Sequence, residues 1–340
     1  MKKVFFYISF VVIIFSFVYL FPYHACVERK AITDFKNTLL SGTICIGSKN
    51  IYGFNDEKAS SITVPANLYL PKNIKDPVPA IIMSHGAGGI FRFHHDYKRL
   101  FLKEGFAVLM IDHFHPRGKI LDNNFVDITE PMMTHDVISA YNLLKKHPLI
   151  SNHIGYVGWS KGGIGTILLK DKRILHKFNL DENSFKFLVG IYTFCGFSFD
   201  EENISKTPLL LISGASDSIT PASFCKNMSE SFKNKHNTKY LEIDNAHHGF
   251  DNYAFYLGAY IPWQPVINDY SDNCSLKIND LYETTNIKGN MKLDSIENRR
   301  SFVDSCTKKG AYAAYNSSAA INAKKALMEF IKINLKTNNP

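Results

Sequence analysis

The sequence lacks the short motifs by which many metal and nucleotide sites are recognised. Its six cysteines include no C-x-x-C pair, which argues against the common structural zinc sites and against a thiol redox centre. It has no Gly-x-Gly-x-x-Gly run and no glycine-rich loop that ends in Gly-Lys-Ser/Thr, so both common phosphate-binding loops are absent. It also has no internal repeat and no low-complexity run. We therefore expect a globular protein without a metal or nucleotide cofactor.

Acidic residues are fewer than basic ones, with 31 Asp and Glu against 39 Lys and Arg and a net charge of +8. Such a balance is compatible with nucleic-acid binding. The lysines, however, are scattered along the chain, and no nucleic-acid-binding motif is present. We expect a lysine-rich solvated surface and no nucleic-acid partner.

A long hydrophobic stretch lies at the N-terminus. After Lys2 and Lys3, residues 4–21 are apolar or aromatic apart from two serines, which is typical of a segment that addresses a chain to a membrane. Residues 1–25 are therefore predicted to be a signal peptide or an N-terminal membrane anchor. The protein is predicted to be exported, either periplasmic or secreted or membrane-anchored, with this segment as its only contact with a membrane.

Cysteine usage agrees with export. Cys195, Cys225, Cys274 and Cys306 could form disulfides in an oxidising compartment, with buried free thiols as the alternative. The spacing alone does not give the pairing.

Residues 26–340 are predicted to form a single α/β domain. Apolar runs alternate with helical periodicities, which favours a mostly parallel sheet with helices on both faces and right-handed crossovers. Residues 255–315 are polar with little periodicity and are expected to be an insertion or lid beside the site. The expected strands are 61–70, 80–84, 107–111, one through Val157, 187–194, 208–212 and 240–243, and the expected helices are 94–104, 133–146, 221–233 and 319–333.

A serine lies between two glycines in Gly158-Trp159-Ser160-Lys161-Gly162, after an apolar strand and before a helix-compatible run. This is the setting in which Gly-x-Ser-x-Gly forms a nucleophile elbow, with a structural turn as the alternative. The glycines remove the β-carbons that would crowd the turn. The backbone N–H of Lys161 would then lie at a helix start, where it can stabilise an oxyanion.

A second glycine-rich loop, residues 85–89, follows the expected strand 80–84. Glycine-rich backbone in this position allows close approach to a ligand. We expect the N–H of Ala87 to be the second oxyanion-hole donor.

A serine hydroxyl needs a base, and the base needs an orienting carboxylate. Loops after the expected strands offer Ser160, Asp217 and His248, in the chain order expected of α/β-hydrolases. Asp244 is an alternative to Asp217, and His247 is an alternative to His248.

Other polar residues are assigned structural roles. Asp112 and Arg117 lie on one loop and are expected to pin it as a charge pair. Four further histidines have spacings that match no common zinc pattern, so they are expected to pack locally or lie on the surface; they are His94, His95, His113 and His115.

Five stretches of the chain form a recognisable set: His85-Gly86-Ala87-Gly88-Gly89, Asp112-x-Phe114-x-Pro116-Arg117-Gly118, Gly158-Trp159-Ser160-Lys161-Gly162-Gly163, Gly214-x-x-Asp217-x-x-x-Pro221 and His248-Gly249-Phe250. In these stretches the chain resembles the dienelactone hydrolase family. The resemblance implies an eight-stranded α/β-hydrolase sheet, a catalytic triad, and hydrolysis of carboxylic esters or lactones without a cofactor. The family's namesake uses a cysteine nucleophile, so Ser160 places this chain in a serine-nucleophile branch.

The sequence thus predicts a serine hydrolase that acts on a small-molecule ester or lactone through an acyl-enzyme. A serine peptidase or acyltransferase of the same fold, and a non-catalytic membrane-tethered binding protein, are the alternatives. Cys195 and Cys225 fall on neighbouring strand-end segments, so a disulfide between them near the Asp217 loop is a further hypothesis.

Overall fold

The computed structural model describes residue 26 and residues 29–36, 40–232, 237–267 and 274–336. The predicted export segment, residues 1–25, lies outside the described residues. Among those described, no helix combines the length and the apolar character needed to cross a bilayer.

An eight-stranded sheet forms the centre of the molecule, in the strand order β1-β2-β4-β3-β5-β6-β8-β9. β2 runs antiparallel to β1 and β4, and the remaining neighbours pair in parallel. This confirms the predicted mostly parallel α/β sheet and its eight strands. The strands are β1 (Gly42–Lys49), β2 (Ser61–Tyr69), β3 (Val78–Ser84), β4 (Ala107–Ile111), β5 (Ile150–Trp159), β6 (Phe185–Ile191), β8 (Leu209–Gly214) and β9 (Thr238–Ile243).

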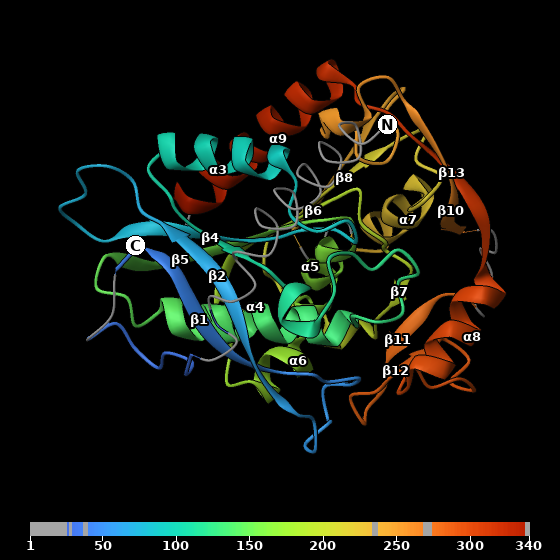
Figure 1. Ribbon diagram of the computed structural model, residues 1–340, viewed down its shortest axis with the longest axis horizontal. Coiled ribbons are helices and arrows are strands. Elements are labelled where there is room, and N and C mark those ends of the chain that lie inside the picture. The colour runs from blue at the N-terminus through green and yellow to red at the C-terminus, as the bar shows by residue number, and fades with distance from the viewer. Residues whose placement is uncertain (1–25, 27–28, 37–39, 233–236, 268–273, 337–340) are drawn as a thin grey trace, which may run out of the picture.

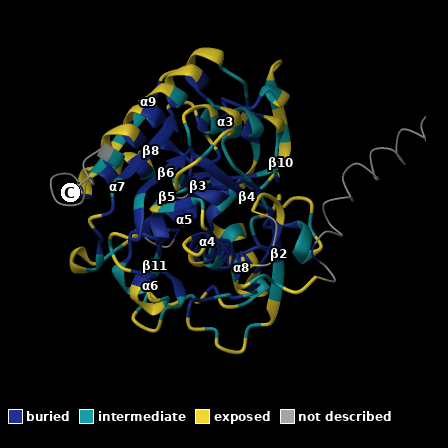
Figure 2. Cartoon of the chain, turned by 90° about the vertical axis from the view of Figure 1, so that its left-hand side faces the viewer, coloured by how far each residue is buried: buried dark blue, intermediate teal, exposed yellow. Residues whose placement is uncertain are grey.

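Helices cover both faces of this sheet (Figure 1). α3 (Arg92–Lys103) and α9 (Ser317–Lys336) pack against one face, and their apolar side chains share a core with alternate residues of β3, β4 and β5. The other face is covered by α4 (Glu130–Leu144), α5 (Ile164–Leu168), α6 (Lys172–Lys177) and α7 (Ala222–Phe232). Figure 2 shows the buried strands at the centre, with exposed residues along the outer side of α9, whereas α5 is buried throughout.

Burial on both faces explains why the central strands read as continuous apolar runs. All five residues of β4 are buried, and so are the last six residues of β5. β1 was not predicted, because residues 44–46 are three consecutive buried positions rather than an alternating pattern. This edge strand has β2 as its only strand neighbour in the sheet among the described residues.

Residues 255–315, hereafter the insertion, are more regular than their polar composition predicted. β10 (Ala259–Ile267) pairs antiparallel with β13 (Thr307–Ala313), and α8 (Ile296–Cys306) leads directly into β13. β11 (Leu276–Ile278) pairs with β12 (Thr284–Asn286) and also, in parallel, with β7 (Phe197–Ser198) of the main body. The insertion is therefore hydrogen-bonded to the domain from which it departs.

Three disulfides join Cys26 to Cys45, Cys195 to Cys225 and Cys274 to Cys306. The hypothesised Cys195–Cys225 bond is confirmed, and no cysteine among the described residues is free. Disulfides of 19 to 32 residues' separation stabilise a fold by about 3 kcal/mol each. Because such bonds persist in oxidising compartments, the set is consistent with an extracellular protein.

Candidate active site

The predicted serine turn lies between β5 and the short 3-10 helix η2 (Ser160–Gly163). Ser160 has a φ of +50°, a left-handed conformation that a non-glycine residue adopts only under constraint. A β-carbon on Gly158 would lie 2.3 Å from the carbonyl oxygen of Gly162, and one on Gly162 would lie 2.4 Å from that of His85. Only glycine fits at both positions, so this spacing is what allows the chain to hold Ser160 in the turn.

Ser160, His248 and Asp217 form a continuous run of hydrogen bonds. His248 Nε2 lies 2.9 Å from Ser160 Oγ, and His248 Nδ1 lies 2.8 Å from Asp217 Oδ2. The three residues follow β5, β9 and β8, which are parallel strands and so end at the same edge of the sheet. The structure thus brings together the three residues that the sequence singled out.

The Asp217 carboxylate is fully buried and saturated with hydrogen-bond donors. Oδ1 accepts from the backbone N–H groups of Ile219 and Thr220, at 2.9 and 3.0 Å. Oδ2 lies 2.9 Å from the hydroxyl of Thr220 in addition to its contact with His248. Because a carboxylate can only accept, the proton of a neutral His248 ring belongs on Nδ1, and Nε2 is left to accept from the serine hydroxyl.

The alternative residues lie elsewhere. Asp244 is exposed at the end of β9. The ring of His247 packs edge-on against Tyr312, with 4.9 Å between centroids. These positions favour Asp217 and His248 as partners of Ser160.

The loop of residues 85–89 lies against Ser160, since a β-carbon on Gly86 would be 2.9 Å from the serine Cβ. The Gly86 carbonyl accepts from His85 Nδ1 at 2.8 Å and from the Gly89 N–H at 3.0 Å. All described peptide bonds are trans, so the N–H of Ala87 points away from the side on which this carbonyl is held. Lys161 is the second residue of η2, where an N–H has no acceptor within the helix. Ala87 and Ser160 line the same cleft and Lys161 follows Ser160 in the chain, so both residues predicted to supply the oxyanion hole lie beside the serine.

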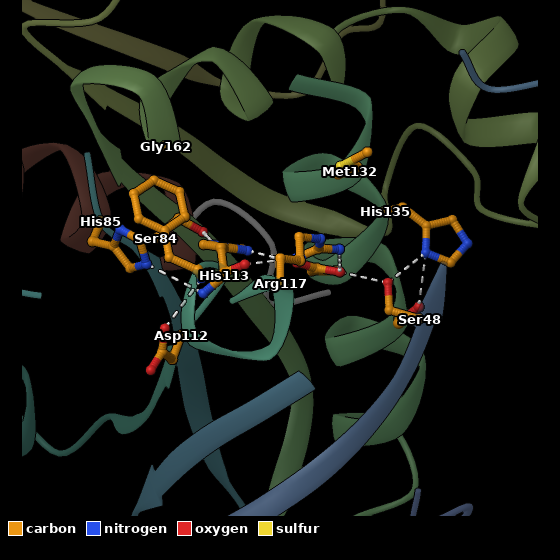
Figure 3. A network of polar contacts seen from close by, with 12 residues as sticks. Ser48, Ser84, His85, Asp112, His113, Arg117, Met132, His135 and Gly162 are labelled. Carbon is orange, nitrogen blue, oxygen red and sulfur yellow. Dashed lines mark hydrogen bonds and ion pairs between the residues drawn. The ribbon is translucent and has the colours of Figure 1, made fainter. Parts of the chain in front are cut away.

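A buried charged network lies behind this loop (Figure 3). Arg117 donates to both oxygens of Asp136, at 2.8 and 3.0 Å, and His113 Nδ1 lies 2.8 Å from Asp136 Oδ2. The predicted Asp112–Arg117 pair is thus wrong: Arg117 reaches α4, and Asp112 binds His115 within its own loop. Burial alone would raise the pKa of Asp136, but Arg117 and His113 hold it well below its usual range.

Hydrogen bonds connect this network to the glycine-rich loop of residues 85–89 through His113 and His85. The Nδ1–H of His113 donates to Asp136, so Nε2 is free to accept from the Ser84 hydroxyl, which lies 2.8 Å away. The backbone N–H of His113 donates to His85 Nε2 at 3.2 Å, which leaves the His85 proton on Nδ1 for Gly86. Burial, aided by the neighbouring His113, lowers the pKa of His85 to about 4. A neutral His85 therefore holds the Gly86 carbonyl.

Another buried carboxylate, that of Asp251, lies three residues after His248. It accepts from the hydroxyls of Tyr97 and Tyr192 at 2.8 and 2.7 Å, and from Trp159 Nε1 at 3.2 Å. Burial raises the pKa of Asp251. Because Trp159 precedes the serine and the Tyr192 ring lies 4.8 Å from that of His248, this carboxylate braces both sides of the site. No motif in the sequence distinguished it.

Two hollows meet at Ser160. The outer cleft has a volume of about 460 Å³ and is lined by residues that include Ala87, His248 and the aromatic residues Tyr260 and Trp263. The inner pocket has a volume of about 90 Å³ and extends beneath the insertion. An ester bound at Ser160 would therefore have space on both sides of its carbonyl.

Within the described part of the chain, no group of three or more His, Cys, Asp and Glu side chains could hold a metal ion. Of the four histidines considered above, His94 and His113 are buried and His115 binds Asp112. The ring of His94 packs against Trp159, with 5.1 Å between centroids. His94 is thus held by packing, whereas His113 and His115 are held by hydrogen bonds to Asp136 and Asp112.

The sheet order, the helices on both faces and the serine elbow define a hydrolase of the α/β-hydrolase fold. A family model, that of the dienelactone hydrolase family, matches residues 64–256, more than half of the chain. The chain belongs to this family. No curated protein sequence matches it.

Solved structures agree with this fold. A dienelactone hydrolase-like promiscuous phosphotriesterase from metagenomic libraries is 13% identical, with a TM-score of 0.54 over 85% of this chain and 97% of its own. A putative dienelactone hydrolase from Klebsiella pneumoniae is 14% identical, with a TM-score of 0.50 over 86% of this chain and 99% of its own. At these identities the likeness concerns the fold alone.

Proposed function

We propose that this protein is a serine hydrolase that cleaves carboxylic esters or lactones through an acyl-enzyme. Ser160 is the nucleophile, His248 the base and Asp217 the orienting carboxylate. The observation that carries the proposal is the unbroken hydrogen-bond run from Asp217 Oδ2 to Ser160 Oγ, at 2.8 and 2.9 Å, which opens into a cleft.

Each step follows from this geometry. Ser160 Oγ attacks the carbonyl carbon while His248 Nε2 takes its proton, and the N–H groups of Ala87 and Lys161 stabilise the oxyanion. One such donor typically contributes about 2.7–4 kcal/mol to catalysis. The carbon–oxygen bond then breaks, and His248 gives the proton to the departing alcohol oxygen. Water attacks the acyl-enzyme with His248 again as base, which releases the acid and restores Ser160.

The test is covalent labelling of the folded protein with a fluorophosphonate, together with hydrolysis of an activated acetate ester. The wild type should be labelled at Ser160, and Ser160→Ala should lose label and activity, the latter by a factor on the order of 10⁴ or more. Ser218→Ala, which alters an exposed serine beside Asp217, is the matched control and should keep both. An unlabelled, folded wild type would contradict the proposal and favour a binding protein.

Two further parts of the proposal need separate tests. Transfer of the acyl group to an added alcohol or amine, measured against hydrolysis, distinguishes an esterase from an acyltransferase. We also take residues 1–25 as an export segment, and the mass of the mature N-terminus from the native host tests whether that segment is removed.

A further inference from the structure

Half of the residues that line the inner pocket come from the insertion. Ser160 and Thr220 open into it from the catalytic side, while its far wall comes from β10, β11, α8 and Leu293, which lies just before α8. That wall is almost entirely apolar. Its apolar side chains from the insertion are Ile267, Leu276, Leu293, Phe302 and Val303.

Each charged side chain that lines the pocket is paired with one of opposite charge. Arg299 Nη1 binds Glu130 Oε2 at 2.6 Å, and the ammonium group of Lys161 binds the buried carboxylate of Asp122. Burial raises the pKa of Glu130, but Arg299 outweighs it and holds the pKa below its usual range, so the pair stays ionised. The pocket therefore offers no net charge to a ligand, and it fits an uncharged, apolar group.

The position of His248 decides which half of an ester enters which hollow. His248 lines the outer cleft together with Ser160, whereas it is not among the residues that line the inner pocket. The departing alcohol oxygen must receive its proton from His248 Nε2, so it must leave on the side of the outer cleft. The acyl chain, on the opposite side of the carbonyl carbon, then points into the inner pocket.

The two volumes set the sizes of the two halves. Since a buried apolar cavity of about 150 Å³ accommodates benzene, the inner pocket of about 90 Å³ has room for about three to four carbon atoms. The outer cleft of about 460 Å³ is five times larger and carries aromatic side chains on its rim. A bulky apolar or aromatic alcohol fits there.

Covalent and ionic links keep the inner pocket from expanding. Cys306, which lines the pocket, is bonded to Cys274, so the end of α8 is tied to the chain just before β11. The Arg299–Glu130 ion pair ties the same helix to the first turn of α4. A chain that exceeds the pocket must therefore displace a braced wall.

We propose that the inner pocket is the acyl site and that the preferred substrates are esters of short uncharged acyl groups with bulky apolar alcohols. The acyl group has up to about five carbons, of which the carbonyl carbon stays at Ser160 and the others enter the pocket. The inference rests on the proposed function. It adds the substrate class and the direction in which the ester lies across Ser160.

Two ester series test it. With 4-nitrophenol as the constant alcohol and acyl chains from two to ten carbons, kcat/KM should peak at three to five carbons. It should then fall at least about tenfold by eight carbons, because a methylene that a pocket cannot hold costs about tenfold or more. With butyrate as the constant acyl group, naphthyl and methyl esters are compared after each kcat/KM is divided by the rate of uncatalysed hydrolysis of the same ester. The corrected value for the naphthyl ester should be at least as high as that for the methyl ester.

Variants assign the effect to the pocket. Phe302→Ala should move the acyl optimum to longer chains, and Val303→Phe should move it to acetate. Trp263→Ala, on the outer cleft, is the matched control and should change the alcohol series while it leaves the acyl optimum in place. Circular dichroism checks that Phe302→Ala folds. If it does not, Val303→Phe and the wild-type acyl-chain profile still test whether the inner pocket sets the acyl optimum.

The inference would be overturned if the wild type cleaved octanoyl esters as well as butyryl esters. It would also be overturned if Phe302→Ala changed the preference for the alcohol instead of the preference for the acyl chain. A failure of the proposed function is distinguishable from these results, because then no ester in either series is cleaved and the fluorophosphonate does not label Ser160.

Discussion

Two buried carboxylates support the candidate active site in opposite ways. Asp136, behind the glycine loop, is paired with the guanidinium of Arg117, and its pKa is lowered. Asp251, behind the serine and histidine loops, binds three neutral donors, and burial raises its pKa. The first network depends on charge, while the second depends on a well-placed acceptor.

The difference has a consequence for stability. A group whose folded pKa is lowered stabilises the fold above its unfolded pKa and loses that contribution in acid. A carboxylate whose folded pKa is raised does the opposite, because protonation relieves the burial of its charge. The ionised Asp136 should therefore stabilise the folded protein at neutral pH. The ionised Asp251 should destabilise it there, and its role is to accept hydrogen bonds from Tyr97, Tyr192 and Trp159.

The largest expected effect is that of Asp136→Asn. This change leaves the Arg117 charge buried without its partner, so the free energy of unfolding should fall by about 3–5 kcal/mol. Urea unfolding at pH 7 measures it. The control is Asp127→Asn, which breaks a partly exposed ion pair with Lys119 and should cost less than about 1 kcal/mol. Equal losses in the two variants would show that the buried Asp136–Arg117 pair contributes no more to stability than a partly exposed pair.

Acid should weaken the Asp136 side of the site through His85. The unfolded chain binds a proton at His85 below pH 6.5, whereas the folded protein does not until about pH 4. The unfolded state thus holds more protons in this window, and unfolding becomes easier as pH falls, by up to about 3 kcal/mol. We expect the difference between pH 7 and pH 4.5 to shrink in His85→Gln. An unchanged pH dependence in that variant would show that other groups carry it.

The smallest expected effect is that of Asp251→Asn. Asparagine keeps an acceptor for Tyr97 and Trp159 and can donate to the Tyr192 hydroxyl, while the cost of burying a charge disappears. The free energy of unfolding at pH 7 should therefore change by no more than about 1 kcal/mol. Asp251→Leu, which leaves three buried donors without an acceptor, should cost several times as much. As pH falls, wild type should gain stability relative to Asp251→Asn, and the reverse trend would contradict the raised pKa.

Local patterns predicted the parts of the site that follow from chain geometry. The elbow was visible because Gly158 and Gly162 have no room for a side chain, and the strand ends brought Asp217 and His248 to it. The two supporting carboxylates were not predicted. Asp136 lies inside a helix and Asp251 in a turn, and only the packed fold reveals what surrounds them.

The charge pair assigned to Asp112 and Arg117 failed for a related reason. Proximity in sequence favoured a contact within the loop, but the 3-10 helix at residues 115–117 turns Arg117 toward α4. The insertion was underestimated because two of its pairings, β10 with β13 and β11 with β7, join segments far apart in the chain. Its polar composition gives no hint of the apolar wall that it turns toward Ser160.

The parallel pairing of β7 with β11 has a consequence for the order of assembly. Strands so distant in sequence meet only after the chain between them has been ordered, because loop closure is costly before other contacts hold it in place. We therefore expect the central sheet to form before the insertion, and the insertion to be the first part to open on heating. Heat should abolish turnover while the spectroscopic signature of the large sheet persists.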